Sequence, residues 1–419
     1  MWNPTSADGD LWTSHSSREA GMSDTRCAIM ALAPQDWGAQ WVNRQQLLSR
    51  IGRHHTVLYS TGGWFMWDRI SDAWRRTPFF GRVIPADNVW VDESPRWLMR
   101  WPRFPVVDRA VMRLEARRWR QWLKARGHSQ LIAHICHPAF GPYLDLLKPR
   151  HVVYHVYDQY DLMPGWSSAL EESERRLLRR SDLVFCASEM MARALQEKVP
   201  RRIEVLPNAA DVGAFFRAAR TMQEPPDLAA VPHPRIGWTG SLHPQIDFGL
   251  IAALARRRPD WHFVFVGNKV NYSEARAEQE YQECLQLRNV HMLGYKHHDE
   301  VPPYVLGMDV NMMCYRLSDE TWIKANSPLK LYEYLAAGRP VVAANLPSVQ
   351  HLSNVVKIAD GVEDWEESIE EALLKGGRGT PDQRRAIAAE NSWDQRAETL
   401  NAWLTQLAGR RPRLTPVSE

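Results

Sequence analysis

The sequence predicts an α/β fold in which two Rossmann-like, doubly wound domains face each other across a cleft. Three observations predict it: the chain length, the alternation of apolar runs with helical stretches, and a proline-rich stretch near the middle. At 419 residues the chain is long enough to bury two hydrophobic cores. Its apolar fraction of 44% and charged fraction of 24% are typical of a globular protein. The net charge of +3 is too small to favour nucleic acid as a partner.

The strands are expected where short β-branched and apolar runs recur. In the first half these runs are Cys27–Leu32, Thr56–Tyr59, Leu131–Ile135, His151–Tyr157, Leu183–Cys186 and Ile203–Leu206. In the second half they are Arg235–Trp238, His262–Val266, Val290–Leu293, Val310–Met313, Val341–Ala344 and Val355–Ile358. Apolar strands separated by helices are typical of parallel sheets covered on both faces. Such sheets bind ligands beyond the carboxyl ends of their strands, so we expect the active site in the cleft between the domains.

The domain boundaries follow from composition. Several prolines mark residues 213–234 as a linker. We therefore expect an N-terminal domain over 25–212 and a C-terminal domain over 235–392. Residues 1–24 are polar and lack the apolar core of a signal peptide, so a disordered extension is expected there, with a tail at 409–419.

The cysteines and the hydropathy indicate a reducing compartment and no membrane-spanning helix. The five cysteines are Cys27, Cys136, Cys186, Cys284 and Cys314. They are odd in number and show no CxxC spacing, so neither a disulfide framework nor a zinc site is indicated. No apolar run approaches the roughly 18–20 residues that cross a bilayer. A cytoplasmic protein is the expectation.

The most informative stretch begins at Ser327, which suits the N-cap of a helix, and Pro328 suits its first position. Lys330 and Glu333 are three residues apart, so both project from one side of the first two turns. Gly338 ends the helix. The start of a helix attracts phosphate, to which Lys330 adds a full charge, and a carboxylate one turn deeper can accept two ribose hydroxyls. A nucleoside diphosphate would satisfy both side chains, although an ordinary amphipathic helix with a Lys–Glu pair remains the alternative.

Other polar residues and glycines follow strands of the second half. Gly240 permits close backbone approach, and Ser241 can donate to a phosphate oxygen. We expect the donor nucleotide to contact these residues together with others at the same sheet edge: Gly267, Lys269, Tyr315 and Arg316. Each signal alone is weak, because a glycine after a strand is commonly only a turn. Their shared placement at carboxyl ends of strands strengthens the prediction.

Two residues of the first half are candidate catalytic groups. Asp158 follows the strand His151–Tyr157, where a carboxylate could take the proton from an attacking hydroxyl. A purely structural role, in which Asp158 caps or orients a loop, is the open alternative. His137 follows the strand Leu131–Ile135 and could hydrogen-bond a sugar hydroxyl, although a structural histidine is the commoner case.

With these residues in view, the chain resembles nucleotide-sugar glycosyltransferases of the two-domain GT-B fold, and most of all the family 4-like bacterial group that builds surface polysaccharides. The resemblance rests on five segments in a fixed order: Ser181–Ser188, Val205–Asp211, Arg235–Leu242, Asn289–Gly294 and Ser327–Val342. It implies that the C-terminal domain binds the nucleotide, with Glu333 on the ribose and Lys330 near the pyrophosphate, and that the N-terminal domain binds the acceptor. It also implies that the last helix, over 393–408, returns to the N-terminal domain.

The chain departs from this family pattern at two places. Many family 4 enzymes carry a glutamate seven residues before the one at 333, where this chain has Ala325. They also place Arg and Lys after the first strand of the nucleotide domain, where the loop here offers only His243 as a cation. Lys330, Arg316, Lys269 or Lys324 would have to substitute, and we favour Lys330. The resemblance implies no metal cofactor, and the only Asp-x-Asp lies in the polar N-terminal stretch.

Residues 96–126 form a basic, tryptophan-rich stretch. Ten Lys or Arg residues occur there against Asp108 and Glu115. Its tryptophans are Trp97, Trp101, Trp119 and Trp122. Tryptophan favours the headgroup region of a bilayer, and clustered cations are attracted to anionic lipids. The stretch therefore favours docking at the inner face of a membrane, with a solvated helix carrying half-buried tryptophans as the alternative.

Together these observations predict a glycosyltransferase that moves a sugar from a UDP or GDP sugar to a hydroxyl of a glycan or lipid-linked acceptor in polysaccharide biosynthesis. Asp158 would act as the base if the reaction inverts the anomeric centre. Two other hypotheses remain open. One is a non-catalytic GT-B-like protein that binds glycan or lipid, motivated by Ala325 and the missing cations. The other is a nucleotide-sugar epimerase, since those enzymes share this architecture.

Overall fold

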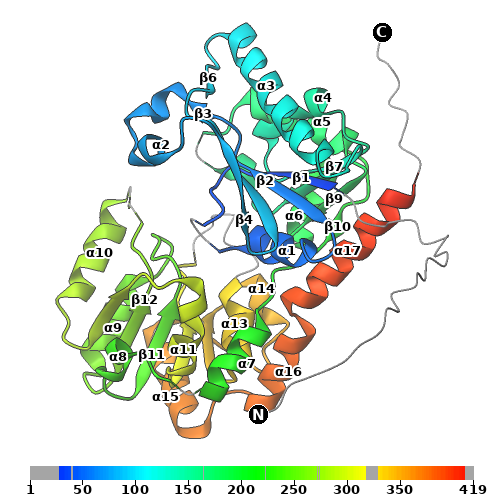
Figure 1. Ribbon diagram of the computed structural model, residues 1–419. Helices are drawn as coiled ribbons and strands as arrows, with labels where there is room; N and C mark the ends of the chain where they lie inside the picture. The colour runs from blue at the N-terminus through cyan, green and yellow to red at the C-terminus, as the bar shows by residue number, and fades with distance from the viewer. Residues whose placement is uncertain are drawn as a thin grey trace, which may run out of the picture.

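The computed structural model describes residues 28–38, 41–163, 165–221, 223–270, 272, 274–317 and 329–410. The extension expected over 1–24, most of the tail expected over 409–419, and the predicted N-cap Ser327 lie outside these residues. The model confirms the predicted α/β class, with one sheet in each half of the chain (Figure 1). None of the described helices is both long and apolar enough to span a bilayer.

The first half is built on an eight-stranded sheet of order β10-β9-β8-β7-β1-β2-β5-β4. Its strands are β1 (Ala28–Leu32), β2 (Thr56–Ser60), β4 (Arg82–Ala86), β5 (Val89–Glu93), β7 (Leu131–Ile135), β8 (His151–Val156), β9 (Leu183–Cys186) and β10 (Glu204–Val205). All neighbours pair in parallel except β4 and β5, which are antiparallel. The short strands β3 (Trp64–Phe65) and β6 (Met99–Arg100) pair separately. Every run predicted in this half forms a strand, whereas β3 to β6 were not predicted.

Helices cover both faces of this sheet. They are α1 (Asn43–Ile51), η1 (Met66–Ile70), α2 (Asp72–Arg76), α3 (Pro105–Lys124), η2 (Pro138–Phe140), α4 (Tyr143–Leu147), η3 (Tyr160–Leu162), α5 (Ser168–Arg180) and α6 (Glu189–Lys198). The apolar side chains of α3 to α6 pack together on one face, and those of α1 pack on the other. The alternating sides of successive strand residues supply both cores.

The second half is built on a six-stranded, all-parallel sheet of order β13-β12-β11-β14-β15-β16. Its strands are β11 (Arg235–Thr239), β12 (His262–Val266), β13 (Val290–Gly294), β14 (Val310–Met313), β15 (Val341–Ala344) and β16 (Lys357–Ala359). Its helices are α7 (Val212–Thr221), α8 (Pro226–Ala229), α9 (Phe248–Arg257), α10 (Ala275–Leu285), η4 (His298–Glu300), α11 (Val301–Leu306), α13 (Leu329–Ala337), α14 (Pro347–Gln350), α15 (Gly361–Lys375) and α16 (Pro381–Glu390). All the runs predicted in this half form strands.

The stretch 213–234, expected as a linker, contains α7 and α8 instead. Phe215 of α7 and Leu228 of α8 are buried in the cores of the second half. Pro226 occupies the first position of α8, where its missing N–H costs nothing. Pro225 and Pro226 therefore begin a helix, whereas Pro232 and Pro234 lie in the short connection between α8 and β11.

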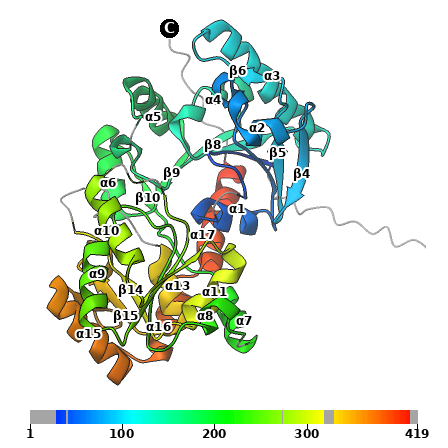
Figure 2. The same cartoon turned by 90° about the vertical axis from the view of Figure 1, so that its left-hand side faces the viewer.

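The chain crosses between the halves twice, at two segments that lie side by side. The Ala210 amide donates to the Asn391 carbonyl, and the Trp393 amide donates to the Ala210 carbonyl, each at 3.0 Å. The last helix, α17 (Trp393–Gly409), then runs back along α1, as the resemblance implied (Figure 2). Leu400 and Leu404 of α17 are fully buried in the core that α1 shares with the first sheet.

Candidate functional site

A cleft of about 650 Å³ lies between the two halves. The wall from the second half is built from the residues that follow β11, β12 and β14 and from the start of α13. The wall from the first half consists mainly of Trp37, Trp41, Gln46, Asp87 and Asn208. Trp37 and Trp41 follow β1, so both walls include residues beyond the carboxyl ends of parallel strands, where ligands of such sheets bind.

Two glycines let the strand ends of the second sheet approach closely. Gly240 has a φ of +120° and Gly267 a φ of +151°, conformations that favour glycine. A Cβ atom at Gly267 would lie 2.0 Å from the Gly240 carbonyl oxygen, which no side chain could tolerate. Both glycines and Ser241 line the cleft, as predicted. A Cβ atom at Gly240 would lie 3.6 Å from the Lys330 ammonium nitrogen, so the lysine lies directly beside this glycine.

Lys330 is a half-buried cation of this wall. Its ammonium group donates to the Tyr315 hydroxyl at 2.9 Å and lies 4.2 Å from the centre of the Trp238 ring. Burial lowers the pKa of Lys330 to about 8, and the charge of Glu333 only partly opposes that shift. Among the described residues no salt bridge to Lys330 is found, so its charge is available to an anion in the cleft.

Glu333 lies one turn further along α13 and also lines the cleft. Burial raises the pKa of Glu333 to about 7, with Lys330 acting against the shift and Asp211 adding to it. Among the described residues, no side chain or backbone group is found hydrogen-bonded to the Glu333 carboxylate. A carboxylate in this position has free capacity to accept hydroxyl hydrogen bonds from a ligand.

Tyr315 and His243 complete the floor beneath Lys330. The two rings stack, with centroids 5.7 Å apart. Burial, followed by the nearby charge of Lys330, lowers the pKa of His243 to about 4. His243 is therefore neutral at neutral pH and cannot be the cation that its place in the loop suggested.

Of the other three predicted cations, Lys324 lies outside the described residues, and Lys269 and Arg316 do not line the cleft. Lys269 is ion-paired with Glu278, and Arg316 with Glu280. Because each charge is already matched by a carboxylate, neither side chain offers a free cation to a diphosphate. Lys330 is the predicted donor-binding cation that the structure brings together with Glu333 and the two glycines.

The predicted catalytic residues Asp158 and His137 follow β8 and β7 but are not among the side chains that line the cleft. Burial raises the pKa of Asp158 to about 6, with Arg44 acting in the opposite direction. The Nδ1 atom of His137 accepts from the Ala139 amide at 3.1 Å, so this side chain caps the short helix η2. Burial lowers the pKa of His137 to about 4.

Sequence reasoning missed the wall formed by the first half. Trp41 stacks on His298 of the opposite half, with ring centroids 4.2 Å apart and planes within 3°. The Trp37 indole donates to Asp87 at 2.9 Å. One feature of the sequence could have indicated this wall. Two tryptophans, Trp37 and Trp41, lie in the loop after the first strand, and no strand or helix pattern accounts for them.

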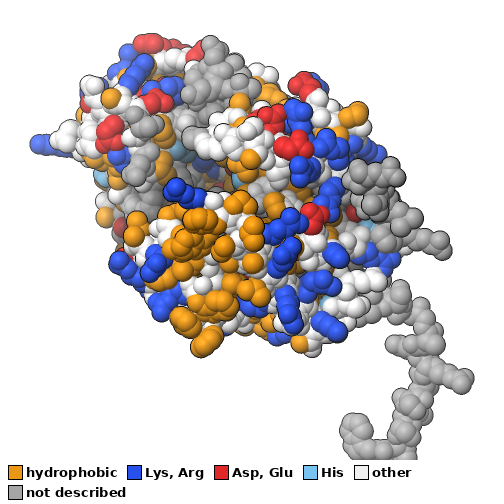
Figure 3. All heavy atoms as spheres, turned by 90° about the horizontal axis from the view of Figure 1, so that it is seen from above, with side chains coloured by type: hydrophobic (Ala, Val, Ile, Leu, Met, Phe, Trp, Pro, Cys, Tyr) orange, Lys and Arg blue, Asp and Glu red, His pale blue; other side chains and the backbone are white. Residues whose placement is uncertain are grey.

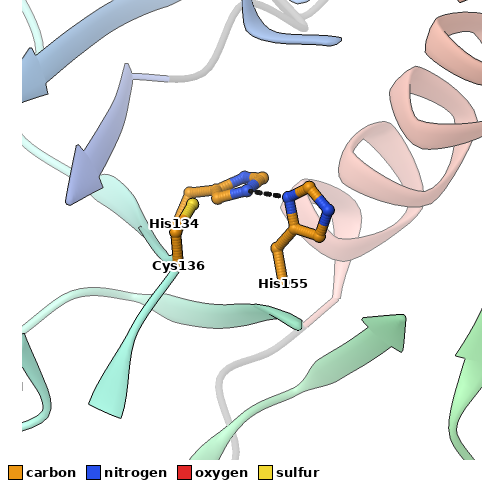
Figure 4. Close-up of side chains that lie close together, drawn as sticks. All are labelled: His134, Cys136 and His155. Atoms are coloured by element: carbon orange, nitrogen blue, oxygen red, sulfur yellow. Dashed lines mark hydrogen bonds between the residues drawn. The ribbon is translucent and has the colours of Figure 1, made fainter. Parts of the chain in front are cut away.

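One buried group of potential metal ligands lies apart from the cleft, on the face of the first sheet that α17 covers (Figure 4). The His134 and His155 rings face each other with a nitrogen–nitrogen distance of 3.4 Å, and Cys136 lies beside them. Burial lowers the pKa of His134 to about 4 and raises that of Cys136 to about 12. The positive charge of Arg44 acts on both Cys136 and His155, which opposes a second cation there. We interpret the group as neutral core side chains.

Comparison with protein families gives a match in each half of the chain. Residues 70–214 match the model described as Glycosyltransferase Family 4, and residues 233–375 match the model described as Glycosyl transferases group 1. The chain is 29% identical over 259 residues to the putative teichuronic acid biosynthesis glycosyltransferase TuaH of Bacillus subtilis. That match spans 57% of this chain and 64% of the relative.

Solved structures of the same fold cover nearly the whole chain. Alr3699/HepE of Anabaena, in complex with UDP and glucose, superimposes with a TM-score of 0.61 at 15% identity, over 90% of this chain and 99% of that one. The sucrose-phosphate synthase of Thermosynechococcus elongatus gives a TM-score of 0.65 at 13% identity, over 91% and 99%. A glycosyltransferase of Rickettsia africae gives 0.64 at 14% identity, over 92% and 99%. At these identities the likeness establishes the fold alone.

Proposed function

We propose that the protein transfers a sugar from a nucleoside diphosphate sugar to an acceptor hydroxyl in polysaccharide biosynthesis. The matches of residues 70–214 to Glycosyltransferase Family 4 and of residues 233–375 to Glycosyl transferases group 1 support the proposal, as does the likeness to solved structures of the GT-B fold. The observation that carries the proposal is the placement of Lys330 and Glu333 on one wall of the interdomain cleft. The UDP held by HepE, and the name of TuaH, support a uridine donor and a polysaccharide product.

In this proposal the leaving diphosphate lies over Gly240, Ser241 and Lys330, at the start of α13. Charge develops on the diphosphate as the glycosidic bond breaks, and a fixed cation in a sheltered cleft stabilises it. Lys330 supplies the positive charge for which other folds use a metal ion, so we propose a metal-independent reaction. Glu333 accepts hydrogen bonds from the ribose hydroxyls.

The acceptor, a glycan or a lipid-linked sugar, would enter along the wall of the first half. An indole such as that of the half-buried Trp41 is suited to contact with a sugar ring, because it offers a rigid apolar surface. We propose Asp158 as the base of an inverting reaction, since its raised pKa of about 6 still leaves it ionised at neutral pH. This role requires the acceptor site to extend beyond the present cleft, along the carboxyl edge of the first sheet.

A ligand-induced thermal shift tests the donor site. We expect UDP to raise the melting temperature of the protein, because a ligand that binds only the folded state stabilises it. Lys330→Ala should abolish most of that rise while leaving the unliganded protein folded. Lys269→Ala is the matched control, because Lys269 is ion-paired with Glu278 outside the cleft and its loss should leave the UDP effect unchanged. An equal UDP effect in wild type and Lys330→Ala would remove Lys330 from the site.

A further inference from the structure

One surface of the first half carries an unusual share of exposed apolar side chains. Of the nineteen large apolar residues exposed among the described residues, ten lie between 67 and 114. Six of these are at least half exposed: Trp67, Ile70, Phe79, Phe80, Phe104 and Val106. We call these six the apolar face. Seen from above, orange side chains gather on this side of the molecule next to blue ones (Figure 3). Patches of this kind on a monomer mark interaction surfaces.

The apolar face overlaps in part with the stretch 96–126 that the sequence indicated, because Phe104 and Val106 lie within that stretch. Trp97 and Trp101 are exposed as well. Trp119 of α3 is fully buried, and Trp122 packs its ring against Trp90 and Arg126. The second half of α3 therefore contributes no exposed tryptophan. The six residues of the apolar face come from η1, the loop after α2 and the start of α3.

These separate segments are tied into one layer. β3 pairs with β6, which joins the segment before η1 to the segment before α3. The Arg96 amide donates to the Pro78 carbonyl at 3.2 Å, which fixes the loop after α2. Phe65 stacks on Trp67 with centroids 4.7 Å apart. The apolar residues are thus displayed together by an ordered support.

A buried polar group underlies that support. Asp108 of α3 accepts from the Arg100 guanidinium and from the Trp101 amide, the latter at 2.8 Å. Arg100 also donates to the Tyr143 hydroxyl at 3.2 Å, and Tyr143 in turn donates to Glu115. Bidentate, partly buried pairs of this type hold their geometry well. These hydrogen bonds hold the backbone that carries the exposed apolar side chains in a fixed position.

Several arginines near the apolar face form no ion pair within the part of the chain that the structure describes. Five exposed arginines have no ion pair with any described residue: Arg69, Arg76, Arg103, Arg109 and Arg113. The nearby exposed acid Asp72 is already paired with Arg75 at 3.3 Å. The outer surface of this region is therefore both apolar and strongly positive.

We propose that the apolar face docks the protein on an anionic phospholipid bilayer. Aromatic and aliphatic side chains enter the boundary between headgroups and acyl chains, while the arginines contact the headgroup phosphates. A second copy of the chain is a poorer occupant, because a two-fold contact would bring the same unpaired arginines together. The use of this docking, which is to hold the cleft near a lipid-linked acceptor, rests on the function proposed above.

The position of the layer suits that use. Residues 61–81 leave the first sheet at the carboxyl end of β2, and the chain returns to the sheet as β4 and β5. The Ser94 hydroxyl donates to the Gly62 carbonyl at 2.9 Å, which holds both ends of the excursion together at that edge. The carboxyl end of β1, which leads to Trp37 and Trp41 in the cleft, is the neighbouring strand end. A docked molecule would present its acceptor wall toward the bilayer.

Flotation with vesicles tests the proposal on the full-length protein. One set of vesicles contains phosphatidylcholine alone, and the other contains phosphatidylcholine mixed with phosphatidylglycerol. We expect binding to the mixed vesicles that weakens as salt is added, because added ions screen the arginines. The triple variant Ile70→Glu, Phe80→Glu and Val106→Glu should bind at least about thirtyfold more weakly, since it loses apolar contacts and gains repulsion.

A matched triple variant controls for the added charge. Phe216, Leu285 and Leu374 are exposed apolar residues of the second half, and their replacement by Glu should leave vesicle binding unchanged. Both triple variants should keep the UDP-induced thermal shift, which separates docking from the donor site. The proposal is overturned if wild type ignores the mixed vesicles, if the apolar-face variant floats like wild type, or if that variant instead abolishes a dimer in solution.

Discussion

At the scale of single residues, burial shifts the pKa values of Lys330 and Glu333 so that the charged form of each side chain is disfavoured. Burial lowers the pKa of Lys330 from 10.5 to about 8 and raises that of Glu333 from 4.5 to about 7. The folded protein therefore binds fewer protons at Lys330 between about pH 8 and 10.5, where stability rises with pH. It binds more protons at Glu333 between pH 4.5 and 7, where stability falls as pH rises. Both groups cost stability as charges, which is typical of side chains positioned for a ligand.

The lowered pKa of Lys330 predicts how UDP binding depends on pH. The affinity should be nearly constant below about pH 8 and should fall above it, approaching tenfold per pH unit, because the lysine must be protonated to pair with the diphosphate. Lys330→Arg is the control, since a guanidinium stays charged throughout this range and keeps Glu333 in place. Isothermal titration calorimetry in buffers from about pH 7 to 10 measures both proteins. A parallel decline in the arginine variant would show that another group causes the pH dependence.

At the scale of elements, the buried parallel strands could be predicted from the sequence and the short edge strands could not. Strands such as β1 and β12 are continuous apolar runs, which only a sheet with two covered faces explains. β4 lies at the sheet edge and reads Arg-Val-Ile-Pro-Ala, in which Arg82 and Pro85 flank only two β-branched residues and no alternation marks a strand. It pairs with β5 through a turn at Asp87 and Asn88, whose φ values are 48° and 66°. That turn depends on two local conformations, for which the residue types give only a weak signal.

The crossing helix α17 leads to a prediction about stability. Leu404→Ala should lower the free energy of unfolding by about 2–5 kcal/mol, because Leu404 is fully buried between α17, α1 and the first sheet. Thr405→Ala changes the exposed neighbour on the same helix and should have an effect within about 0.5 kcal/mol. Chemical denaturation measures both variants. Equal stabilities would mean that α17 does not complete the core of the first half.

At the scale of the whole molecule, the sequence could predict the two domains and one wall of the cleft. Lys330, Glu333 and the glycines were predictable because strand ends of one sheet lie along one edge, so their neighbourhood follows from chain order. The wall of the first half depends on how loops of two separate sheets face each other. Trp41 and His298, for example, stack on each other, although nothing in the sequence pattern indicates that these two residues are close in space. The same reason explains why Asp158 could be assigned to the correct sheet edge and still not line the cleft.

The two walls lead to a prediction that separates donor binding from transfer. Trp41→Leu should leave the UDP-induced thermal shift close to that of wild type, because the predicted diphosphate and ribose contacts all come from the other half. Transfer to acceptor should fall about tenfold, the size of effect expected from losing a stacked aromatic contact. Lys330→Ala is the reciprocal variant, in which UDP binding and transfer fall together. The thermal shift with UDP and the rate of transfer should be measured for both variants. Loss of UDP binding in Trp41→Leu would contradict the prediction, because it would mean that the nucleotide contacts both walls of the cleft.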